Sequence, residues 1–94
     1  MADFPIMLSG PLSRQTVSNP EPLVEGRLYR VWVRIIELSQ GAVCVWVGGN
    51  RTAFFSAAGE HVETIAAGER QDVMVQGLDA VATIDGVAVR PVAD

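Results

Sequence analysis

Lysine is absent from this chain of 94 residues, which carries only one histidine and one cysteine. All seven basic residues are arginine, and eleven aspartate and glutamate residues outnumber them, giving a formal net charge of −4. Nucleic-acid binding needs clustered cations that displace counterions from phosphates, so this balance argues against a nucleic-acid partner. The lone cysteine, Cys44, cannot form an intrachain disulfide, and its place within an apolar segment predicts burial as a small hydrophobic side chain.

The sequence also lacks the side-chain groupings that catalysis or metal binding requires. A zinc site normally uses three or four ligands, whereas His61 has only Glu60 and Glu63 as local neighbours. The serines lie in no nucleophile-elbow pattern, and no helix follows residues 48–50 to help bind a phosphate. We therefore expect a protein that is not an enzyme, that has no catalytic residue, cofactor or metal, and that places His61 on the surface where a strand begins.

Long hydrophobic runs are absent too. A transmembrane helix needs about 20 consecutive apolar residues, and no stretch approaches that length. The N-terminal residues have neither a basic region nor a long apolar run, so they do not resemble a secretory signal. We expect a soluble protein, made in a cytoplasm, that does not insert into a membrane.

Period-2 alternation of apolar and polar residues runs from Gly26 to Val92 and is the strongest positive signal. Such alternation directs every second side chain to one face of a sheet, and no segment shows the 3.6-residue stripe of an amphipathic helix. Short segments of this kind recur at intervals of about 8 to 12 residues, which is typical of a β-sandwich or barrel. The expected strands are 27–37, 42–47, 52–57, 61–66, 71–76 and 81–92.

The predicted fold is therefore all-β, a single antiparallel β-sandwich of jelly-roll type with six to eight short strands over residues 25–94. Residues 1–24 hold four of the five prolines, which remove backbone donors, so we predict an extended N-terminal arm with at most an edge strand at Leu12 to Val17. Disordered segments usually lack apolar residues, so the apolar residues of this arm are predicted to dock on a partner. They are Phe4, Ile6, Met7, Leu8 and Leu12.

Both tryptophans fall on the outward face of the first two expected strands. An antiparallel pairing of these strands that keeps their valines inward puts Trp32 across from Trp46, with Arg30 and Arg34 beside them. Three interpretations are open. The pair forms a partner or subunit interface, where tryptophan and arginine are enriched, or the arm covers it, or it is a platform for stacking sugar rings. We predict these four residues to be partner-binding.

Two short motifs interrupt the strand pattern. Asp85-Gly86 breaks the last strand and indicates a bulge or turn, with calcium binding as the alternative. Phe54 and Phe55 are adjacent and so face opposite sides of their strand. We expect one of them in the core and the other under a second surface.

Four segments, taken in order, carry a resemblance to a known family: EGRLYRV (25–31), VCVWVGG (43–49), FSAAGEHVETIAAG (55–68) and ATIDGVAV (82–89). They resemble the small jelly-roll domains, akin to carbohydrate-binding modules, that recur in bacteriophage virion proteins such as tail fibres, head fibres and capsid decoration proteins. The resemblance covers roughly residues 23–92. The family usually has asparagine after the aspartate of the last strand, and this chain has Gly86 there instead.

The resemblance implies a virion structural protein, most similar to a capsid decoration (cement) or head-fibre protein. It implies the major capsid protein or another virion protein as partner, a homo-oligomer with a trimer favoured, and a location in the virion. In that role the arm would attach the module to the shell, so deleting residues 1–20 would leave a folded module that no longer attaches. The alternative is a host-surface carbohydrate-binding module of a phage tail or head fibre, with the tryptophans stacking on sugar.

Overall fold

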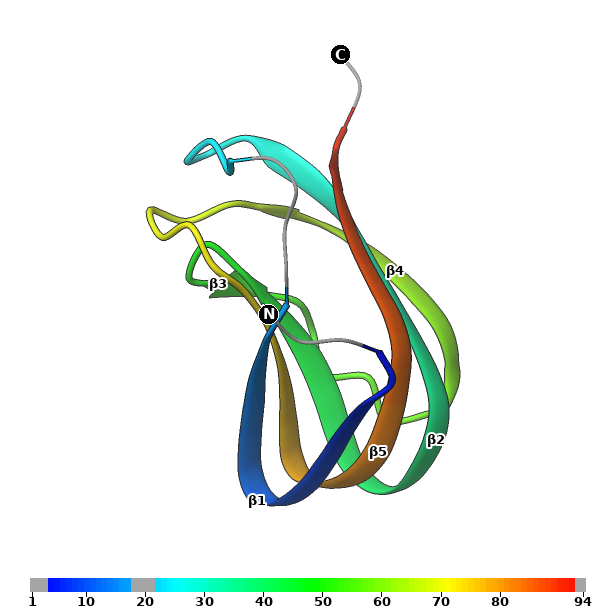
Figure 1. Ribbon diagram of the computed structural model, residues 1–94. Coiled ribbons are helices and arrows are strands. Elements are labelled where there is room, and N and C mark those ends of the chain that lie inside the picture. The colour runs from blue at the N-terminus through cyan, green and yellow to red at the C-terminus, as the bar shows by residue number, and fades with distance from the viewer. Residues whose placement is uncertain (1–3, 18–21, 93–94) are drawn as a thin grey trace.

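The computed structural model describes residues 4–17 and 22–92, which form an antiparallel β-sheet curled into a half-barrel (Figure 1). The order within the sheet is β1-β5-β2-β3, and β4 pairs with β2. No described residue is helical, so no helix capable of crossing a membrane occurs among them. The all-β prediction is confirmed, although the described residues form fewer and longer strands than expected. These are β1 (Ile6–Val17), β2 (Leu28–Val47), β3 (Asn50–Arg51), β4 (Gly59–Ala66) and β5 (Val73–Pro91).

The longest elements, β2 and β5, form a bent antiparallel ribbon. Their register runs from Tyr29 opposite Pro91 to Val47 opposite Val73, with shifts confined to residues 34–42 of β2. Unpaired extra residues of this kind bend a strand and increase its twist. The predicted pairing of 27–37 with 42–47 is therefore wrong, because both segments belong to β2 and pair with β5.

Gly41 stands at this bend. Its φ is +76°, a left-handed conformation that glycine adopts without steric cost. A Cβ at this position would overlap the backbone carbonyl of Asp79, itself at φ 48°. The predicted antiparallel pairing of 27–37 with 42–47 would require a hairpin turn between them, but Gly41 instead lets two bent strands pass close together.

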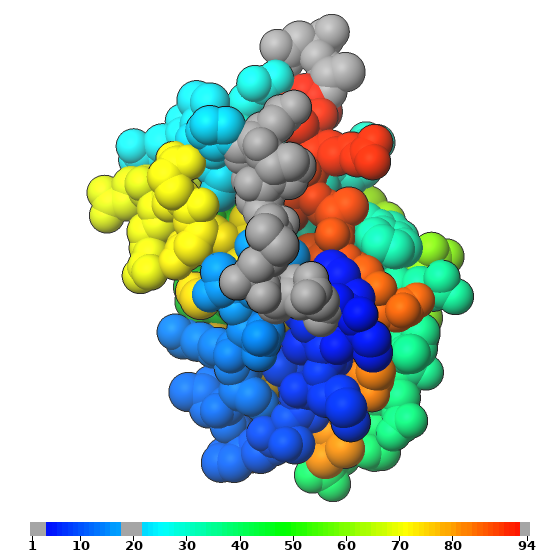
Figure 2. Space-filling model, viewed as in Figure 1, coloured from blue at the N-terminus to red at the C-terminus, as the bar shows by residue number. Residues whose placement is uncertain are grey.

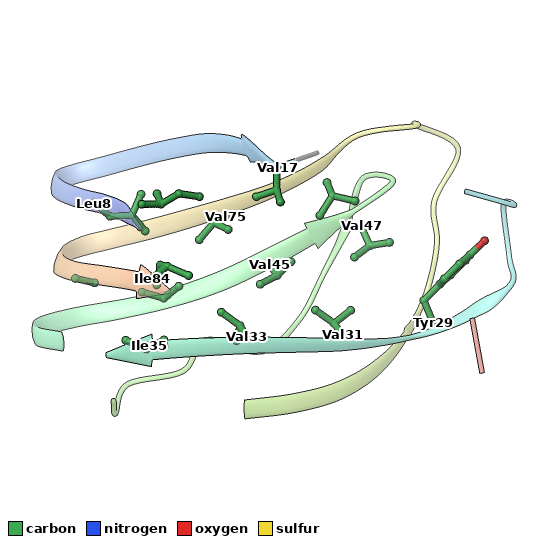
Figure 3. Packing of buried hydrophobic residues seen from close by; sticks show 14 of the residues in the cluster. Leu8, Val17, Tyr29, Val31, Val33, Ile35, Val45, Val47, Val75 and Ile84 are labelled. Atoms are coloured by element: carbon green, nitrogen blue, oxygen red, sulfur yellow. The ribbon is translucent and has the colours of Figure 1, made fainter. Parts of the chain in front are cut away.

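The core lies inside the curl. Inward residues of the first half of β2 (28–35) point toward those of its second half (42–47), as Figure 3 shows for Val31, Val33, Val45 and Val47. All four are at most 1% exposed. The predicted inward face of both segments is thus confirmed, and the two halves face each other across the core instead of pairing side by side.

The predicted arm is the main correction to the fold. Ile6–Val17 is β1, an edge strand paired with β5 on both sides of Pro11, from Ile6 opposite Ile84 to Val17 opposite Val73. Ile6 and Leu8 are 4% and 2% exposed and belong to the core. The prolines misled the prediction. Pro11 has no backbone N–H, but an edge strand tolerates this because only one of its two sides pairs with another strand. Residues 1–3 and 18–21 of the predicted arm lie outside the described residues.

The region between β2 and β4 also differs from the prediction. The expected strand at 52–57 is reduced to the two-residue β3 and one isolated bridge between Val43 and Phe55. Phe55 packs against the core, whereas Phe54 is 36% exposed with the Arg51 guanidinium 4.5 Å from its ring centroid. Phe55 is therefore the core member of the pair, as expected, whereas Phe54 is exposed and its cover by a second surface stays a prediction.

The bulge predicted at Asp85-Gly86 is present. Arg34 of β2 lies opposite Gly86 and Ile35 lies opposite Ile84, so Asp85 is an extra residue on β5. After this point the inward positions of β5 change from even to odd numbers, which keeps Val87 and Val89 against the core. The bulge also determines which residues of β5 lie beside Trp32.

Candidate functional site

The outward face of residues 28–35 carries three predicted site residues, Arg30, Trp32 and Arg34, as alternation requires. This half of β2 lies between β4 and β5, so each of the three has a neighbour on both sides. Arg30 lies between Thr64 and Arg90, Trp32 between Val62 and Ala88, and Arg34 between Glu60 and Gly86.

The Trp32 indole is held from both neighbouring strands. Its Nε1 donates a hydrogen bond to Glu60 Oε1 at 3.2 Å on the β4 side. On the β5 side the ring lies so close to Gly86 that a Cβ there would come within 2.9 Å of Cζ3. Gly86 therefore makes room for the indole.

Arg34 and Arg30 differ in their ionic surroundings. Arg34 Nη1 lies 3.6 Å from Asp85 Oδ2, on the bulge. Arg30 lies directly opposite Arg90, and neither has a carboxylate within ion-pair distance among residues 4–17 and 22–92. Like charges in directly opposed positions destabilise a sheet. The positive charge of Arg34 is thus balanced by Asp85, whereas the charges of Arg30 and Arg90 are not balanced by a carboxylate within ion-pair distance among the described residues.

A groove of about 480 Å³ opens beside this arginine pair. Arg30 and Arg90 are exposed and Trp32 is half-buried. The groove, called the Trp32 groove from here on, combines an aromatic surface, an apolar lining and two cations. Its residues are Arg30, Trp32, Ala88, Arg90, Pro91 and Val92.

Trp46 lies on another part of the sheet, so the predicted pair with Trp32 is wrong. Its Nε1 donates to Gln76 Oε1 at 2.6 Å, and the Arg14 guanidinium lies 5.5 Å from its ring centroid. Arg14 Nε also donates to Gln76 Oε1, at 3.2 Å. The interpretation that Phe4, Ile6 or Leu8 of the arm covers a tryptophan pair is not confirmed: Ile6 and Leu8 are in the core, and the N-terminal residue beside Trp46 is Arg14.

Cys44 lies opposite Gln76, on the same outward side of the sheet as Trp46, and it is fully buried. Burial raises the pKa of the Cys44 thiol, and the positive charge of Arg51 offsets part of that rise. The nucleophilic form of cysteine is the thiolate. A buried thiol with a raised pKa stays protonated at neutral pH, so Cys44 is a packing residue, as the sequence predicted.

Exposed apolar side chains of β1 and β5 lie in two cross-strand groups on either side of the bend, which together we call the outer apolar patch. It consists of Met7, Leu12, Leu78 and Val81, which are 79%, 58%, 42% and 40% exposed. Leu12 lies directly opposite Leu78, and Val81 lies two residues from Thr83, the partner of Met7. Figure 2 shows β1 and β5 side by side on this side of the molecule.

The predicted partner-binding residues of the N-terminal segment thus divide into two groups. Met7 and Leu12 are exposed, and Phe4 is 37% exposed. Ile6 and Leu8 face the core, so their assignment as partner-binding residues is wrong. Period-2 alternation along β1 separates the two groups, a signal that the prolines obscured.

The groups most suited to acid–base chemistry hold a loop in place. His61 is half-buried, stacked on Phe55 with ring centroids 4.5 Å apart, and its Nε2 donates to the Ala57 carbonyl oxygen at 2.7 Å. The Glu63 carboxylate accepts a hydrogen bond from the backbone N–H of Ala53. His61 is partly exposed and lies near the start of β4, as expected, and its ring contacts Phe55 and the Ala57 carbonyl. No group of three His, Cys, Asp or Glu residues that could hold a metal occurs within 4–17 and 22–92.

Sequence reasoning missed Arg90, Gly86, Leu78 and Val81 as site residues. Alternation through 87–91 places Arg90 on the outward face, so part of the signal was present. What alternation cannot give is the neighbouring strand, and only the β2–β5 register brings Arg90 beside Arg30.

No protein-family model matches the chain, and no curated protein matches it either. The outer apolar patch and the Trp32 groove are the two surfaces from which we infer a function.

Proposed function

We propose that this chain is a non-enzymatic virion structural protein, a capsid decoration (cement) protein that binds and stabilises the capsid shell. The resemblance of its glycine-bounded β segments to the jelly-roll domains of phage virion proteins supports the virion role. The outer apolar patch carries the proposal of shell binding, because exposed apolar surface of this kind marks interaction sites.

In this proposal the patch replaces the extended arm as the attachment surface. Met7 and Leu12 come from the segment predicted to dock, and Leu78 and Val81 extend their surface onto β5. Burying apolar surface contributes roughly 25 cal/mol per Å². One such contact is weak, but many copies on a shell gain avidity if the chain forms the proposed trimer, and binding stabilises the assembled lattice by mass action.

Co-sedimentation with shells assembled from the major capsid protein tests this proposal. Leu12→Asp places a charge in the patch and is expected to weaken shell binding by about tenfold or more, since it removes apolar contact and buries a charge. Val62→Asp is the matched control, because Val62 is 57% exposed, against 58% for Leu12, and lies on β4 in the other half of the sheet. Equal binding by the two variants would overturn the proposal.

The Trp32 groove favours a second candidate function, a surface carbohydrate-binding module. Its half-buried indole beside Ala88, Pro91 and Val92 offers the apolar, aromatic surface on which the C–H face of a sugar ring packs. Trp46 is not the residue to test, since Arg14 and Gln76 already engage it. Loss of glycan-array binding in Trp32→Ala, with an unchanged circular dichroism spectrum and with binding retained in Leu12→Ala, would support this candidate, because Leu12 is exposed on β1 and does not line the groove.

A further inference from the structure

The Trp32 groove has a charge pattern that a neutral sugar would leave unused. We propose that it binds a saccharide carrying a carboxylate or sulfate group, with Arg30 and Arg90 holding the anion and Trp32 packing against the ring. This inference rests on the second candidate function above and names its ligand class.

The arginine pair is the first step of the argument. Arg30 and Arg90 are direct cross-strand partners, so their Cβ atoms are separated by only about 4.5–5.5 Å. Two guanidinium groups in this arrangement repel each other unless an anion lies between them. Arginine forms planar, bidentate hydrogen bonds with carboxylate and other oxyanions, so an anionic ligand would remove the repulsion and gain charge-assisted hydrogen bonds.

Arg34 differs from Arg30 in having acidic residues nearby, so the lack of acidic neighbours among the described residues is specific to the part of the face around Arg30. Arg34 stands on the same face of the same strand, yet it has Asp85 at 3.6 Å and Glu60 on the neighbouring strand. The chain carries eleven acidic residues against seven basic ones, but the row through Arg30 has only Thr64 on its β4 side. Acidic residues therefore occur on this face beside Arg34 and Trp32, whereas the direct cross-strand partners of Arg30 are Thr64 and Arg90.

The apolar side of the groove determines the kind of anion. Trp32 is fixed by Glu60 and by its contact with Gly86, so the ring is already ordered before a ligand binds. Ala88, Pro91 and Val92 continue the apolar lining. A free inorganic anion would use the arginines alone, whereas an acidic saccharide would use the cations and the apolar surface together.

Size and charge favour a saccharide over a nucleic acid. The groove, at about 480 Å³, lies within the roughly 300–1,000 Å³ typical of small-molecule sites. A nucleic acid carries a phosphate at every nucleotide and needs an extended track of cations. This chain has a net charge of −4, and the groove presents Arg30 and Arg90 only.

Isothermal titration of the purified full chain with three probes tests the inference: 3′-sialyllactose, a heparin-derived disaccharide and neutral lactose. We expect at least one anionic probe to bind about tenfold or more tightly than lactose, because a charge-assisted hydrogen bond contributes about that factor. Arg90→Gln should abolish this preference. Arg34→Gln removes the same charge from the same face and should keep it.

Gly86→Ala gives an independent readout, since the added Cβ displaces the indole and should weaken both anionic and neutral saccharides. Tighter binding of lactose than of either anionic probe, with no effect of Arg90→Gln, would overturn the anionic assignment and leave the carbohydrate-binding candidate intact. Equal losses in Arg90→Gln and Arg34→Gln would also overturn it, because they would indicate general electrostatic attraction. Failure of all three probes, together with an empty glycan array, would overturn both the assignment and the candidate function.

Discussion

Ile6 of β1 lies directly opposite Ile84 of β5, and both side chains are buried in the core. Ile84 is also the partner of Ile35, at the point where β2 and β5 bend. The N-terminal segment therefore completes the core beside the Asp85 bulge. Its exposed residues, Met7 and Leu12, are held in place by the same pairing and form half of the outer apolar patch.

The first prediction compares two adjacent residues of β1. Leu8→Ala removes a side chain that is 2% exposed, and large-to-small changes of this kind cost about 2–5 kcal/mol. Met7 is 79% exposed, and Met7→Ala should change stability by no more than about 0.5 kcal/mol. Urea unfolding of the two variants measures the difference, and similar midpoints for both would show that β1 does not pack as described.

Deleting residues 1–17 is expected to unfold the domain. The deletion uncovers inward residues of β5, including Val75 and Ile84, both 0% exposed in the intact chain. A domain of this size has only about 5–15 kcal/mol of stability to lose. Circular dichroism and thermal melting of the truncated chain provide the measurement. A cooperative melt near that of the full chain would instead support the independent module that the sequence suggested.

Gly41 should be among the least replaceable glycines. Gly41→Ala combines a positive φ with overlap on the Asp79 carbonyl, both of which are backbone constraints that side-chain rotation cannot relieve. Gly10→Ala is the matched control, since Gly10 also has a positive φ, of 101°, but nothing lies within 4 Å of the added Cβ. The control should lose about 1–3 kcal/mol from backbone strain, and Gly41→Ala clearly more. Equal melting temperatures for the two variants would contradict the close approach at the bend.

Cys44 predicts a pH dependence of stability. Because burial raises the pKa of the folded thiol, the unfolded chain releases the thiol proton first, above its ordinary pKa of about 8.5. The stability contributed by the neutral thiol is therefore complete below that pH and is lost as the pH rises toward the folded pKa. Unfolding free energies at neutral and alkaline pH should fall more steeply for the wild type than for Cys44→Ala. Parallel pH profiles would show that the thiol is not buried as described.

Alternation predicted the faces of the strands well, because side-chain direction in a strand depends only on local backbone geometry. Val31, Val33, Val45 and Val47 are inward as expected, and the bulge at Asp85 follows from the glycine beside it. These features require no knowledge of which strands are neighbours.

Strand pairing could not be predicted in the same way. A glycine at position 41 is compatible with a hairpin turn or with a bent continuous strand, and the choice depends on the long-range register with β5. The error over Gly41 led directly to the predicted Trp32–Trp46 pair, and it left Arg90 out of the site. The prolines had a similar effect on β1, since an edge strand tolerates them and a central strand does not.

The most direct test of shell attachment is a cryo-electron microscopy reconstruction of capsid shells decorated with this chain. Attachment through the outer apolar patch predicts Met7, Leu12, Leu78 and Val81 at the contact with the shell. Shells that bind no chain, or a bound chain whose patch faces solvent while the groove contacts the shell, would contradict the proposed function.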